Sequence, residues 1–325
     1  MADHQTTTIH AKAGRAVGAP ANASLRRKKP AKSKGTRSFF KDRGVRLFNG
    51  DAVTVLNSLP ENSVDLIFAD PPYNLSNGGF SCHAGKRVSV NKGAWDKSNG
   101  FEKDYDFHYN WIEACRRVLK ENGSLWVSGT YHSIYICGFA LQSQRWHLLN
   151  EICWYKPNAS PHLACRMFAA SHETLLWARK TKKAKHKFNY DLMKQSEWPG
   201  DFIKKSDRQM RSVWAINTPK RDEKKFGKHP AQKPVSLLER IVLACTNEND
   251  IVLDPFCGSA TTGVAALRHG RNFVGIDAEK KYLSGMAVKR IRETIKETMT
   301  REIFTVSENA VAEPAAAYFE EMFAA

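Results

Sequence analysis

Two kinds of hydrophobic pattern alternate along this chain, and together they predict its elements. Short apolar runs of strand length lie at residues 45–48, 64–69, 125–127, 152–155, 251–253 and 273–276. Helical spacing is found at residues 52–59, from 104 to the Asn122-Gly123 pair, at 133–144, at 237–245, and after 259 up to about 268. The run at residues 172–179 fits either a strand or a helix. Strands that alternate with helices predict an α/β fold with a mostly parallel sheet.

The apolar run at residues 64–69 ends abruptly in Asp70, Pro71, Pro72 and Tyr73. The prolines cannot continue a central strand, because proline lacks an N–H group and fixes φ. The Asp70 carboxylate, the Pro71 carbonyl and the Tyr73 ring should therefore lie at the carboxyl end of the strand, where open α/β sheets bind ligands. The two oxygens could accept N–H groups from an amine on an aromatic ring, and Tyr73 could stack on that ring. An ordinary strand-end turn is the alternative, since Asp-Pro and Pro-Pro are common in turns.

A second strand, at residues 251–253, opens the sequence DPFCGSATTG. Its small residues allow a tight turn into a helix, and the next strand ends in Asp277, 19 residues after Gly258. That spacing is close to the one at which a carboxylate binds ribose hydroxyls. The sequence has neither a GxGxxG fingerprint nor a Walker lysine here, which favours a nucleoside without a pyrophosphate. A plain β-α-β turn is the alternative.

Asp51 follows the strand at residues 45–48, so it should lie at the same edge of the sheet as Asp70. The predicted helix at residues 52–59 begins directly after it. Asp51 could therefore serve a ligand or act only as the N-cap of this helix, and the sequence leaves both roles open.

The composition is that of a globular protein, with 42% hydrophobic and 26% charged residues among 325. This length allows one large domain or two small ones. No apolar stretch is long enough to span a membrane and the N-terminus has no hydrophobic signal core, so we expect a cytoplasmic protein. The seven cysteines are scattered without a CxxC pair, which favours reduced core residues over disulfides or a zinc site.

The net charge of +17 is concentrated in two segments of the chain. Residues 1–46 contain 12 Lys/Arg and two acidic residues, and residues 179–228 contain 16 Lys/Arg and six acidic residues. Two basic regions on a nearly neutral body favour a polyanionic partner, nucleic acid first, over merely solvated loops. Aromatic residues interleave with the cations of the second segment, which suits a nucleic-acid surface or a small satellite core. This pattern does not identify the residues that read bases.

In their order, DPPY, a basic segment and DPFCGSATTG resemble the β-group of amino-group DNA methyltransferases. The resemblance runs from about residue 46 to about residue 296 and includes NGD, RRVLKENGSLWV, HETLLWARK, HPAQKP and FVGIDAEKKYL. The loop at residues 74–98 is most similar to that of the second methyltransferase of GATC restriction–modification systems, which methylates adenine and can accept single-stranded DNA. The resemblance implies a doubly wound, Rossmann-like methyltransferase sheet, circularly permuted so that the catalytic half precedes the cofactor half.

The resemblance also implies partners and residue roles. The cofactor would be S-adenosylmethionine and the substrate a flipped adenine in DNA, with a second copy of the chain and a restriction endonuclease as further partners. Asp70 and the Pro71 carbonyl, in the motif that Pro72 and Tyr73 complete, would accept the adenine N6 protons, and Tyr73 and Tyr155 would stack on the base. The residues implied for cofactor binding are Asp51, His229, Gln232, Lys233, Asp254, Phe256, Gly258, Ser259 and Asp277. Of these, Asp51 would approach the adenine of the cofactor, Asp277 its ribose, and His229, Gln232 and Lys233 its methionine end.

Together these features divide the chain into five segments. They are a disordered basic tail (1–43), a catalytic half (44–178), a basic target-recognition segment (179–228), a cofactor-binding half (229–297) and a C-terminal tail (298–325). Ordered structure is expected to begin at Val45, residues 76–100 to form a long loop without structure, and residues 316–323 to form a short helix.

Ala260 departs from the family, whose members usually have glycine there. If this position needs a positive φ, the alanine methyl group could crowd the cofactor loop. Several functional alternatives therefore stay open: a cytosine-N4 methyltransferase, although those enzymes more often have serine at the Asp70 position, a GANTC adenine methyltransferase, an RNA methyltransferase, and a catalytically weak DNA-binding protein of the same fold.

Overall fold

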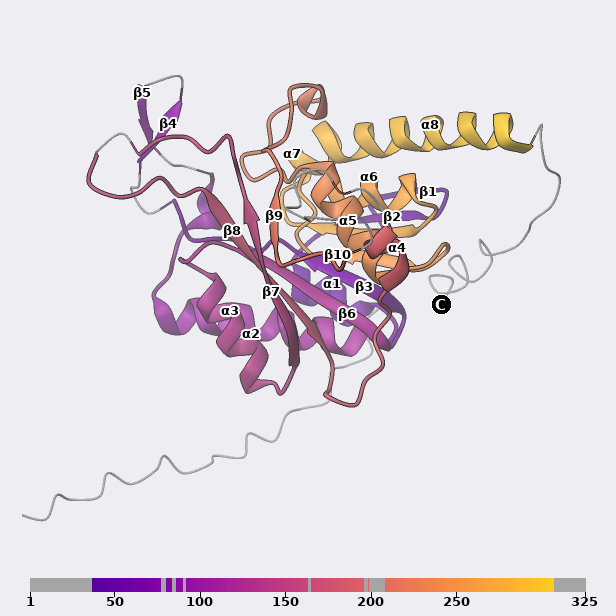
Figure 1. The fold of residues 1–325 in the computed structure, drawn as a ribbon, viewed down its shortest axis with the longest axis horizontal. Coiled ribbons are helices and arrows are strands. Elements are labelled where there is room, and N and C mark those ends of the chain that lie inside the picture. Colours follow the sequence, from indigo (N-terminus) through magenta and orange to yellow (C-terminus); the bar gives the residue numbers. More distant parts are fainter. Residues whose placement is uncertain are drawn as a thin grey trace, which may run out of the picture. The chain divides into compact units, whose positions relative to one another are not determined.

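The apolar runs of the sequence form one mixed sheet, which has nine strands in the described part of the chain (Figure 1). In order across the sheet these are β1 (Phe40–Asp42), β2 (Val45–Asn49), β11 (Asn272–Asp277), β10 (Ile251–Asp254), β3 (Val64–Ala69), β6 (Leu119–Gly129), β8 (His172–Arg179), β7 (His147–Tyr155) and β9 (Val213–Ala215). The computed structural model describes residues 37–76, 80–83, 86–89, 92–162, 165–195, 198 and 208–306, which all belong to one compact unit.

The five central strands β2, β11, β10, β3 and β6 are parallel, which confirms the predicted α/β sheet. β1 runs antiparallel to β2, and β8 runs antiparallel to both β6 and β7. β7 therefore points in the same direction as the central strands, and it pairs in parallel with β9. Because β3 precedes β10 in the chain, the half that carries DPPY precedes the half that carries DPFCGSATTG, as the resemblance implies.

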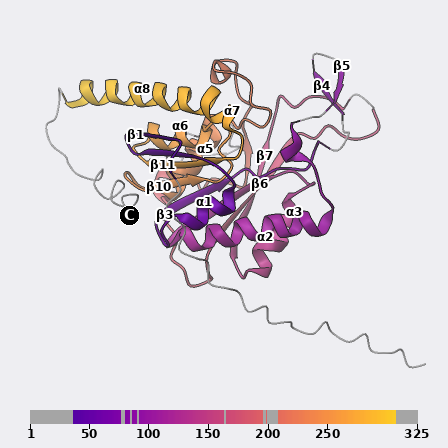
Figure 2. The same ribbon diagram turned by 180° about the vertical axis from the view of Figure 1, so that it is seen from behind.

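Helices cover both faces of the sheet, so the fold is doubly wound. On one face lie α1 (Ala52–Ser58), α2 (Phe101–Val118) and α3 (Ile134–Ser143), and α2 packs against both α1 and α3 (Figure 2). On the other face lie α4 (Tyr190–Gln195), α5 (Val235–Cys245), α6 (Thr261–Arg268) and α8 (Val288–Val306), with α7 (Lys280–Tyr282) and the π-helix η3 (Leu283–Ala287) leading into α8. In the described ranges, none of the helices has the length and apolarity needed to cross a membrane.

Side chains of alternate strand residues enter the two separate core layers. Leu66 and Phe68 of β3 pack among the residues of α5, α6 and α8, whereas Ile67 and Ala69 pack among those of α1, α2 and α3. A central parallel strand covered on both faces needs apolar residues on both sides, which explains the continuous apolar run in the sequence.

The adjacent strands β3 and β10 form the topological switch point of the sheet. Leu66 pairs with Val252 and Ile67 with Leu253. From β3 the chain continues through α2 to β6 on one side, and from β10 it continues through α6 to β11 on the other side. The two connections leave in opposite directions, so a crevice opens at the carboxyl ends of these strands, where such sheets bind ligands.

Two expectations about the first part of the chain are wrong. Ordered structure begins before Val45, because β1 pairs with β2 as an antiparallel edge strand. The segment at residues 76–100 contains the hairpin strands β4 (Phe80–His83) and β5 (Lys86–Ser89) and the short 3-10 helix η1 (Ala94–Asp96). The remaining residues of the predicted basic tail, 1–36, and the helix predicted at residues 316–323 lie outside the described residues.

Two further boundaries also differ from the sequence prediction. Asn122 and Gly123 lie inside β6 and do not end α2, which stops at Val118. Gly123 is needed there for close approach, since a Cβ would lie 2.6 Å from the Asp65 carbonyl oxygen of β3. α8 continues to Val306, so the segment boundary at residue 297 falls within a helix. The ambiguous run at residues 172–179 is the strand β8.

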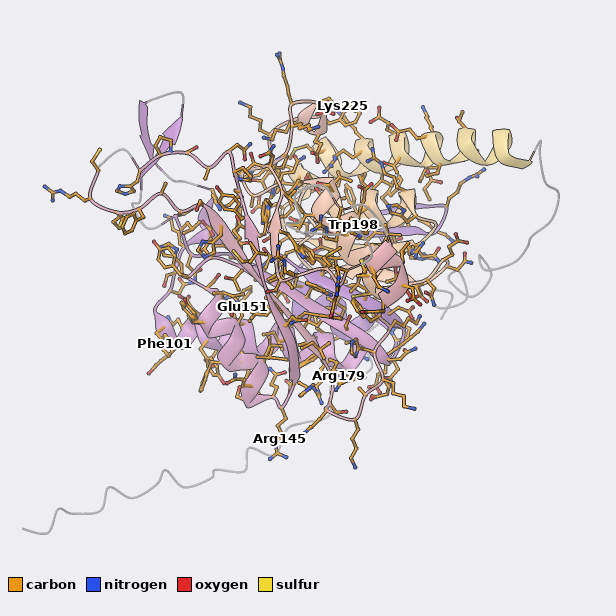
Figure 3. The ribbon with its side chains drawn as sticks, viewed as in Figure 1. Phe101, Arg145, Glu151, Arg179, Trp198 and Lys225 are labelled. Carbon is orange, nitrogen blue, oxygen red and sulfur yellow. The ribbon has the colours of Figure 1, made fainter. Side chains whose placement is uncertain are left out.

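The basic segment at residues 179–228 is partly built into the main fold. It contributes β9 to the sheet and α4, which packs on α5. Trp198 (labelled in Figure 3) and Trp214 hold the buried guanidinium of Arg240 from α5, which lies 5.1 and 4.9 Å from their ring centroids. Some aromatic residues of the basic segment therefore belong to the core, which agrees with the satellite core that was one of the two interpretations of the sequence.

A buried carboxylate in β3 ties this segment to the sheet. Asp65 is 1% exposed and forms salt bridges with Lys120 (2.8 Å) and Lys187 (2.9 Å). It also accepts a hydrogen bond from the backbone N–H of Ile251 in β10. Burial opposes ionisation of this carboxyl, but these partners outweigh burial and lower its pKa. Asp65 thus connects β3, β6, β10 and the start of the basic segment.

We expect Asp65→Asn to lower the free energy of unfolding by about 3 kcal/mol, because it leaves the ammonium groups of Lys120 and Lys187 short of a buried counterion. This loss is at the low end of the values for broken buried salt bridges, because both lysines are partly exposed. Urea unfolding measures the change. Asp191→Asn, at an exposed position of α4, is the matched control, and equal stability of the two variants would contradict the proposed role.

Candidate active site

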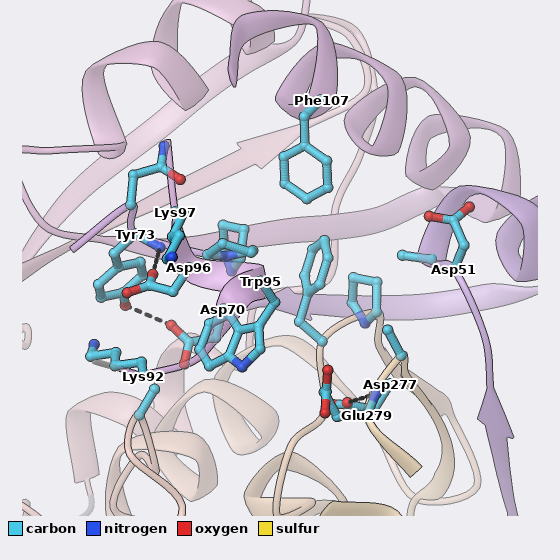
Figure 4. A pocket seen from close by; sticks show the side chains of 18 of the residues that line it. Asp51, Asp70, Tyr73, Lys92, Trp95, Asp96, Lys97, Phe107, Asp277 and Glu279 are labelled. Atoms are coloured by element: carbon cyan, nitrogen blue, oxygen red, sulfur yellow. Dashed lines mark hydrogen bonds between the residues drawn. The ribbon is translucent and has the colours of Figure 1, made fainter. Parts of the chain in front are cut away.

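A cavity of about 320 Å³ lies at the crevice between the two halves of the sheet (Figure 4). Asp51 after β2, Asp70 after β3 and Asp277 at the end of β11 all line it. Phe256, from the turn after β10, lines it too. The fold thus brings together residues that are up to 226 positions apart in the sequence, because neighbouring parallel strands end at one edge.

Both oxygens of the Asp70 carboxylate have partners in this structure. Oδ1 accepts a hydrogen bond of 2.6 Å from the Tyr73 hydroxyl, and Oδ2 is 2.5 Å from the Lys233 ammonium. The backbone N–H of Tyr73 donates to Asp96, which is fully buried and also accepts from Leu75 and Ser76. η1 therefore fixes the turn that follows the two prolines.

The Tyr73 ring is buried, with 4% of the residue exposed. The ammonium groups of Lys233 and Lys92 lie 5.0 and 5.2 Å from its centroid. Lys92 comes from the segment after DPPY, so a base could stack on Tyr73 only after this arrangement opens. Tyr155 is 38% exposed at the end of β7 and does not line any of the described cavities around Asp70, whereas its neighbours Trp154 and Lys156 do.

A second carboxylate, which the sequence analysis did not single out, lies beside Asp70. Glu173 of β8 accepts a hydrogen bond from Lys156 (3.1 Å), and its Oε2 lies 3.5 Å from Lys233. The same Oε2 lies 2.9 Å from the Tyr73 hydroxyl, which can donate its single proton to either carboxylate. It shares with Tyr73, Lys156 and Lys233 the lining of a smaller cavity of about 200 Å³. Two features of the sequence point to it: it is an acidic residue at the start of the ambiguous run at residues 172–179, and it belongs to HETLLWARK, one of the motifs that carry the family resemblance.

The two carboxyls have opposite pKa shifts. Burial raises the pKa of Asp70, and the charge of Glu173 adds to this rise, although Lys233 opposes it. Burial also disfavours the Glu173 carboxylate, but Lys233 and Lys156 outweigh burial and lower its pKa to about 2. Glu173 is therefore a fixed negative charge, whereas Asp70 is the carboxyl whose protonation state is more easily changed.

The loop after β10 is organised by two further carboxylates. Asp254 is buried and accepts hydrogen bonds from the Phe256 N–H (3.0 Å) and the Thr262 hydroxyl (2.6 Å). Asp277 accepts from the N–H groups of Gly258 (2.8 Å) and Glu279 (2.7 Å). Asp254 thus shapes the loop from inside, while Asp277 connects it to the end of β11 and still lines the cavity.

Glycine is required at residue 258 on two counts. Its φ is +51°, and a Cβ there would lie 2.9 Å from the His229 ring. His229 packs edge-on against Tyr282, with 4.4 Å between the ring centroids. Burial and the nearby cations Lys233 and Lys92 lower the pKa of His229 to about 3, so the ring is neutral. The loop and His229 therefore form a close-packed wall of the cavity.

Ala260 has a φ of +58° and is fully buried at the N-terminal end of α6. Residue 260 therefore does need a positive φ, the condition under which an alanine was expected to be strained. An alanine in this left-handed conformation is disfavoured by roughly 1–2 kcal/mol. Its neighbour Ser259 is held by Arg290 of α8, which donates to both the Ser259 carbonyl and hydroxyl oxygens. Arg290 belongs to the functional neighbourhood that sequence reasoning missed.

The other residues implied for the cofactor take mixed roles. Asp51 caps α1 by accepting from the Thr54 N–H and hydroxyl, so the N-cap interpretation is confirmed, and it lines the cavity as well. Gln232 donates to the Glu223 carbonyl and lines a second, small cavity of about 20 Å³, which Asp70 and Gly258 also line. Phe107 points from α2 towards Phe256, 6.1 Å between centroids, and adds an aromatic wall (Figure 4).

These residues fit S-adenosylmethionine. Phe107 and Phe256 would give apolar faces for an adenine, and Asp277 would accept hydrogen bonds from ribose hydroxyls. The loop at Gly258 leaves room that a side chain there would fill. The Trp95 indole N–H also lines the cavity and finds no acceptor among the described residues, so a ligand oxygen could satisfy it.

Gly258→Ala should weaken binding of S-adenosylmethionine about tenfold or more, because left-handed strain of about 1–3 kcal/mol adds to contact with the His229 ring. Isothermal titration calorimetry measures the affinity. Gly285→Ala is the control, since Gly285 has open space around it and no positive φ. An unchanged affinity in Gly258→Ala would show that the loop does not approach the cofactor.

Asp254 should make stability fall with rising pH. Burial, aided by the charges of Asp70 and Asp277, raises its pKa to about 7, so the folded state favours the protonated form. The contribution of Asp254 to the free energy of unfolding is complete below the pKa of the unfolded state, near 3.9. This contribution, up to about 4 kcal/mol, is lost as the pH rises to about 7. Urea unfolding of Asp254→Asn between pH 4 and pH 8 should lack this dependence, whereas the exposed control Asp106→Asn should keep it.

Known proteins are similar to this chain in both sequence and fold. The profile of the DNA methylase family of N6 and N4 methyltransferases matches residues 64–289. The Type II methyltransferase M2.LlaDCHI of Lactococcus lactis subsp. cremoris is 49% identical over 259 residues, which are 79% of this chain and 93% of that protein. M2.DpnII of Streptococcus pneumoniae is 49% identical over 257 residues, 79% of this chain and 92% of that protein.

Solved structures agree with these relationships. The complex of M1.HpyAVI with S-adenosylmethionine has a TM-score of 0.54 and 28% identity, over 76% of this chain and 98% of that one. The cytosine-N4-specific PvuII DNA methyltransferase has a TM-score of 0.56 at 18% identity, over 89% and 92% of the two chains, and supports the fold alone. The predicted fold and cofactor are confirmed, and the chain belongs to the DNA methylase family of S-adenosylmethionine-dependent N6/N4 methyltransferases.

Proposed function

We propose that this enzyme methylates the N6 amino group of adenine in DNA, within the short target GATC. The observation that carries the proposal is the Asp70 carboxylate, which follows β3 and faces the cavity that Phe256 and Asp277 line. The similarity to Type II M2 methyltransferases over most of the chain supports a target of the restriction–modification kind. The aspartate at position 70 favours adenine N6 over cytosine N4.

The proposed chemistry needs positioning more than a strong base. S-adenosylmethionine supplies an activated methyl group on a sulfonium centre. Asp70 and the Pro71 carbonyl accept hydrogen bonds from the two N–H groups of the amine and thereby orient the nitrogen lone pair. Asp70 also stabilises the positive charge that develops on this nitrogen. As the new N–C bond forms, the bond between the methyl group and the sulfonium would break and leave a neutral thioether. One N–H proton would then leave the nitrogen, and the raised pKa of Asp70 makes this carboxylate suited to take it.

DNA binding is assigned to the basic segment at residues 179–228, whose lysines and arginines would contact phosphates. The target base must leave the helix, which costs a few kcal/mol and less in a single strand. It would stack on Tyr73 once Lys92 moves aside, and Tyr155, exposed at the end of β7, would be the second stacking surface. Such an enzyme acts on cytoplasmic, nucleoid DNA. A second copy of the chain and a cognate restriction endonuclease are the further partners we propose.

Asp70→Ala should keep binding S-adenosylmethionine but lower methyl transfer at least about 100-fold, since it removes the group that orients the amine. Transfer of labelled methyl groups to unmethylated DNA measures the rate, and Asp106→Ala, on the exposed side of α2, is the control. Retained transfer by Asp70→Ala would overturn the role of Asp70.

The product of the unaltered enzyme tests the substrate. Mass spectrometry of the methylated nucleosides should find N6-methyladenine, and methylome sequencing should place it in GATC. N4-methylcytosine would support the cytosine alternative, and methyladenine in GANTC the other adenine target. Methylated RNA without methylated DNA would support an RNA methyltransferase, and no product at all would support the weakly catalytic DNA-binding protein.

A further inference from the structure

Two buried carboxylates at the active site share the same two donors. The Lys233 ammonium is 2.5 Å from Asp70 Oδ2 and 3.5 Å from Glu173 Oε2. The Tyr73 hydroxyl is 2.6 Å from Asp70 Oδ1 and 2.9 Å from Glu173 Oε2. The side chains of Lys233, Asp70 and Glu173 are 5, 11 and 12% exposed, so protein groups rather than bulk water satisfy them.

The fold holds Glu173 firmly in this place. It is the second residue of β8, whose first residues lie at the edge of the sheet where β6 and β7 end. Lys156, just beyond β7, forms a 3.1 Å salt bridge with Glu173 Oε1, the oxygen that neither shared donor contacts. Ser128, near the end of β6, also approaches Oε2 and the Tyr73 hydroxyl. Glu173 is therefore oriented independently of Asp70.

This arrangement bears on how Asp70 can receive an amine. Each of its oxygens already has one donor, Tyr73 or Lys233, and although each oxygen can accept a further hydrogen bond, turning the carboxylate towards an amine in the cavity would lengthen these two contacts. A buried ammonium or hydroxyl left without a partner would be strongly unfavourable. Each of these donors already has other acceptors within 3.5 Å. They are the Ala231 carbonyl for Lys233, the Ser128 hydroxyl for Tyr73, and for both donors the carboxylate of Glu173, which can also balance the charge of the Lys233 ammonium.

We propose that Glu173 is a positioning residue for methyl transfer, which takes over Lys233 and Tyr73 when Asp70 turns to the substrate amine. The inference rests on the proposed function of Asp70. The exchange breaks no covalent bond and moves no proton, because Lys233 stays an ammonium and Glu173 a carboxylate. It leaves the total charge of the cluster unchanged and leaves neither shared donor without an acceptor.

Glu173→Gln tests the proposal, since glutamine keeps the shape but loses the charge. We expect kcat to fall about 10- to 100-fold, with the affinity for S-adenosylmethionine and the KM for DNA within about threefold of the unaltered enzyme. Glu151→Gln is the matched control, because Glu151 is exposed on the neighbouring strand β7 (Figure 3) and should leave kcat unchanged. An unchanged kcat in Glu173→Gln overturns the proposal.

A purely structural role of Glu173 is separated by two further measurements. Because Glu173 raises the pKa of Asp70, the acidic limb of the kcat profile should move to lower pH in Glu173→Gln. A double-mutant cycle combines Glu173→Gln with Tyr73→Phe, which removes the shared hydroxyl. In the Tyr73→Phe enzyme, Glu173→Gln should lower kcat much less than it does in the unaltered enzyme. An unmoved acidic limb together with additive losses would mean that Glu173 only supports the fold.

If Glu173→Gln does not fold, the paired variant Glu173→Gln/Lys156→Gln restores the charge balance and is measured in its place, with Lys156→Gln as its reference. Equal kcat values for these two variants would overturn the proposal. The result is independent of which base is methylated, since a cytosine amine would need the same freed carboxylate. A finding of N4-methylcytosine would therefore change the proposed function but leave the role of Glu173 intact.

Discussion

The parallel pairing of β3 with β10 is the constraint on which this site depends. It joins segments that lie 186 residues apart, with Leu66 beside Val252 and Ile67 beside Leu253. Only this pairing brings the turn after β3 next to the loop after β10, because the chain then leaves the two strands in opposite directions. Asp65 reinforces it, since its carboxylate accepts the Ile251 N–H and is held by two lysines.

The same pairing concentrates acidic residues at one edge of the sheet. Asp51, Asp70, Asp254 and Asp277 all follow or end neighbouring parallel strands. The structure accommodates them with donors of different kinds: backbone N–H groups for Asp277, a hydroxyl and an N–H for Asp254, and the Lys233 ammonium for Asp70. Asp51, Asp70 and Asp277 line the cavity, whereas Asp254 is buried and holds the loop after β10.

The basic segment at residues 179–228 supports the core in a way that its composition alone did not show. Trp198 and Trp214 enclose Arg240, and β9 extends the sheet beyond β7, so part of the segment belongs to the core. Lys187 is part of the same support, because it bridges Asp65 and Asp250. The described part of this segment is therefore continuous with the catalytic sheet.

Local patterns in the sequence predicted much of the fold. Apolar runs located the central strands, since a strand buried on both faces needs apolar residues on both, and helical spacing located α1, α3, α5 and α6. Those patterns failed where a long-range contact overrides local preference. Gly123 was interpreted as a helix end but allows β6 to approach β3, and β1 is a strand because it pairs with β2.

The sequence by itself determined the chemical groups of the site, because DPPY and DPFCGSATTG carry their residues at fixed local spacing. It also flagged Ala260, whose positive φ the structure then revealed. Only the tertiary structure decided which groups meet. Glu173, Lys156 and Arg290 could not be recognised beforehand, since a charged residue shows its role only through partners that folding brings near. Through such partners the motif around Asp70 becomes a cluster of two carboxylates that share their donors.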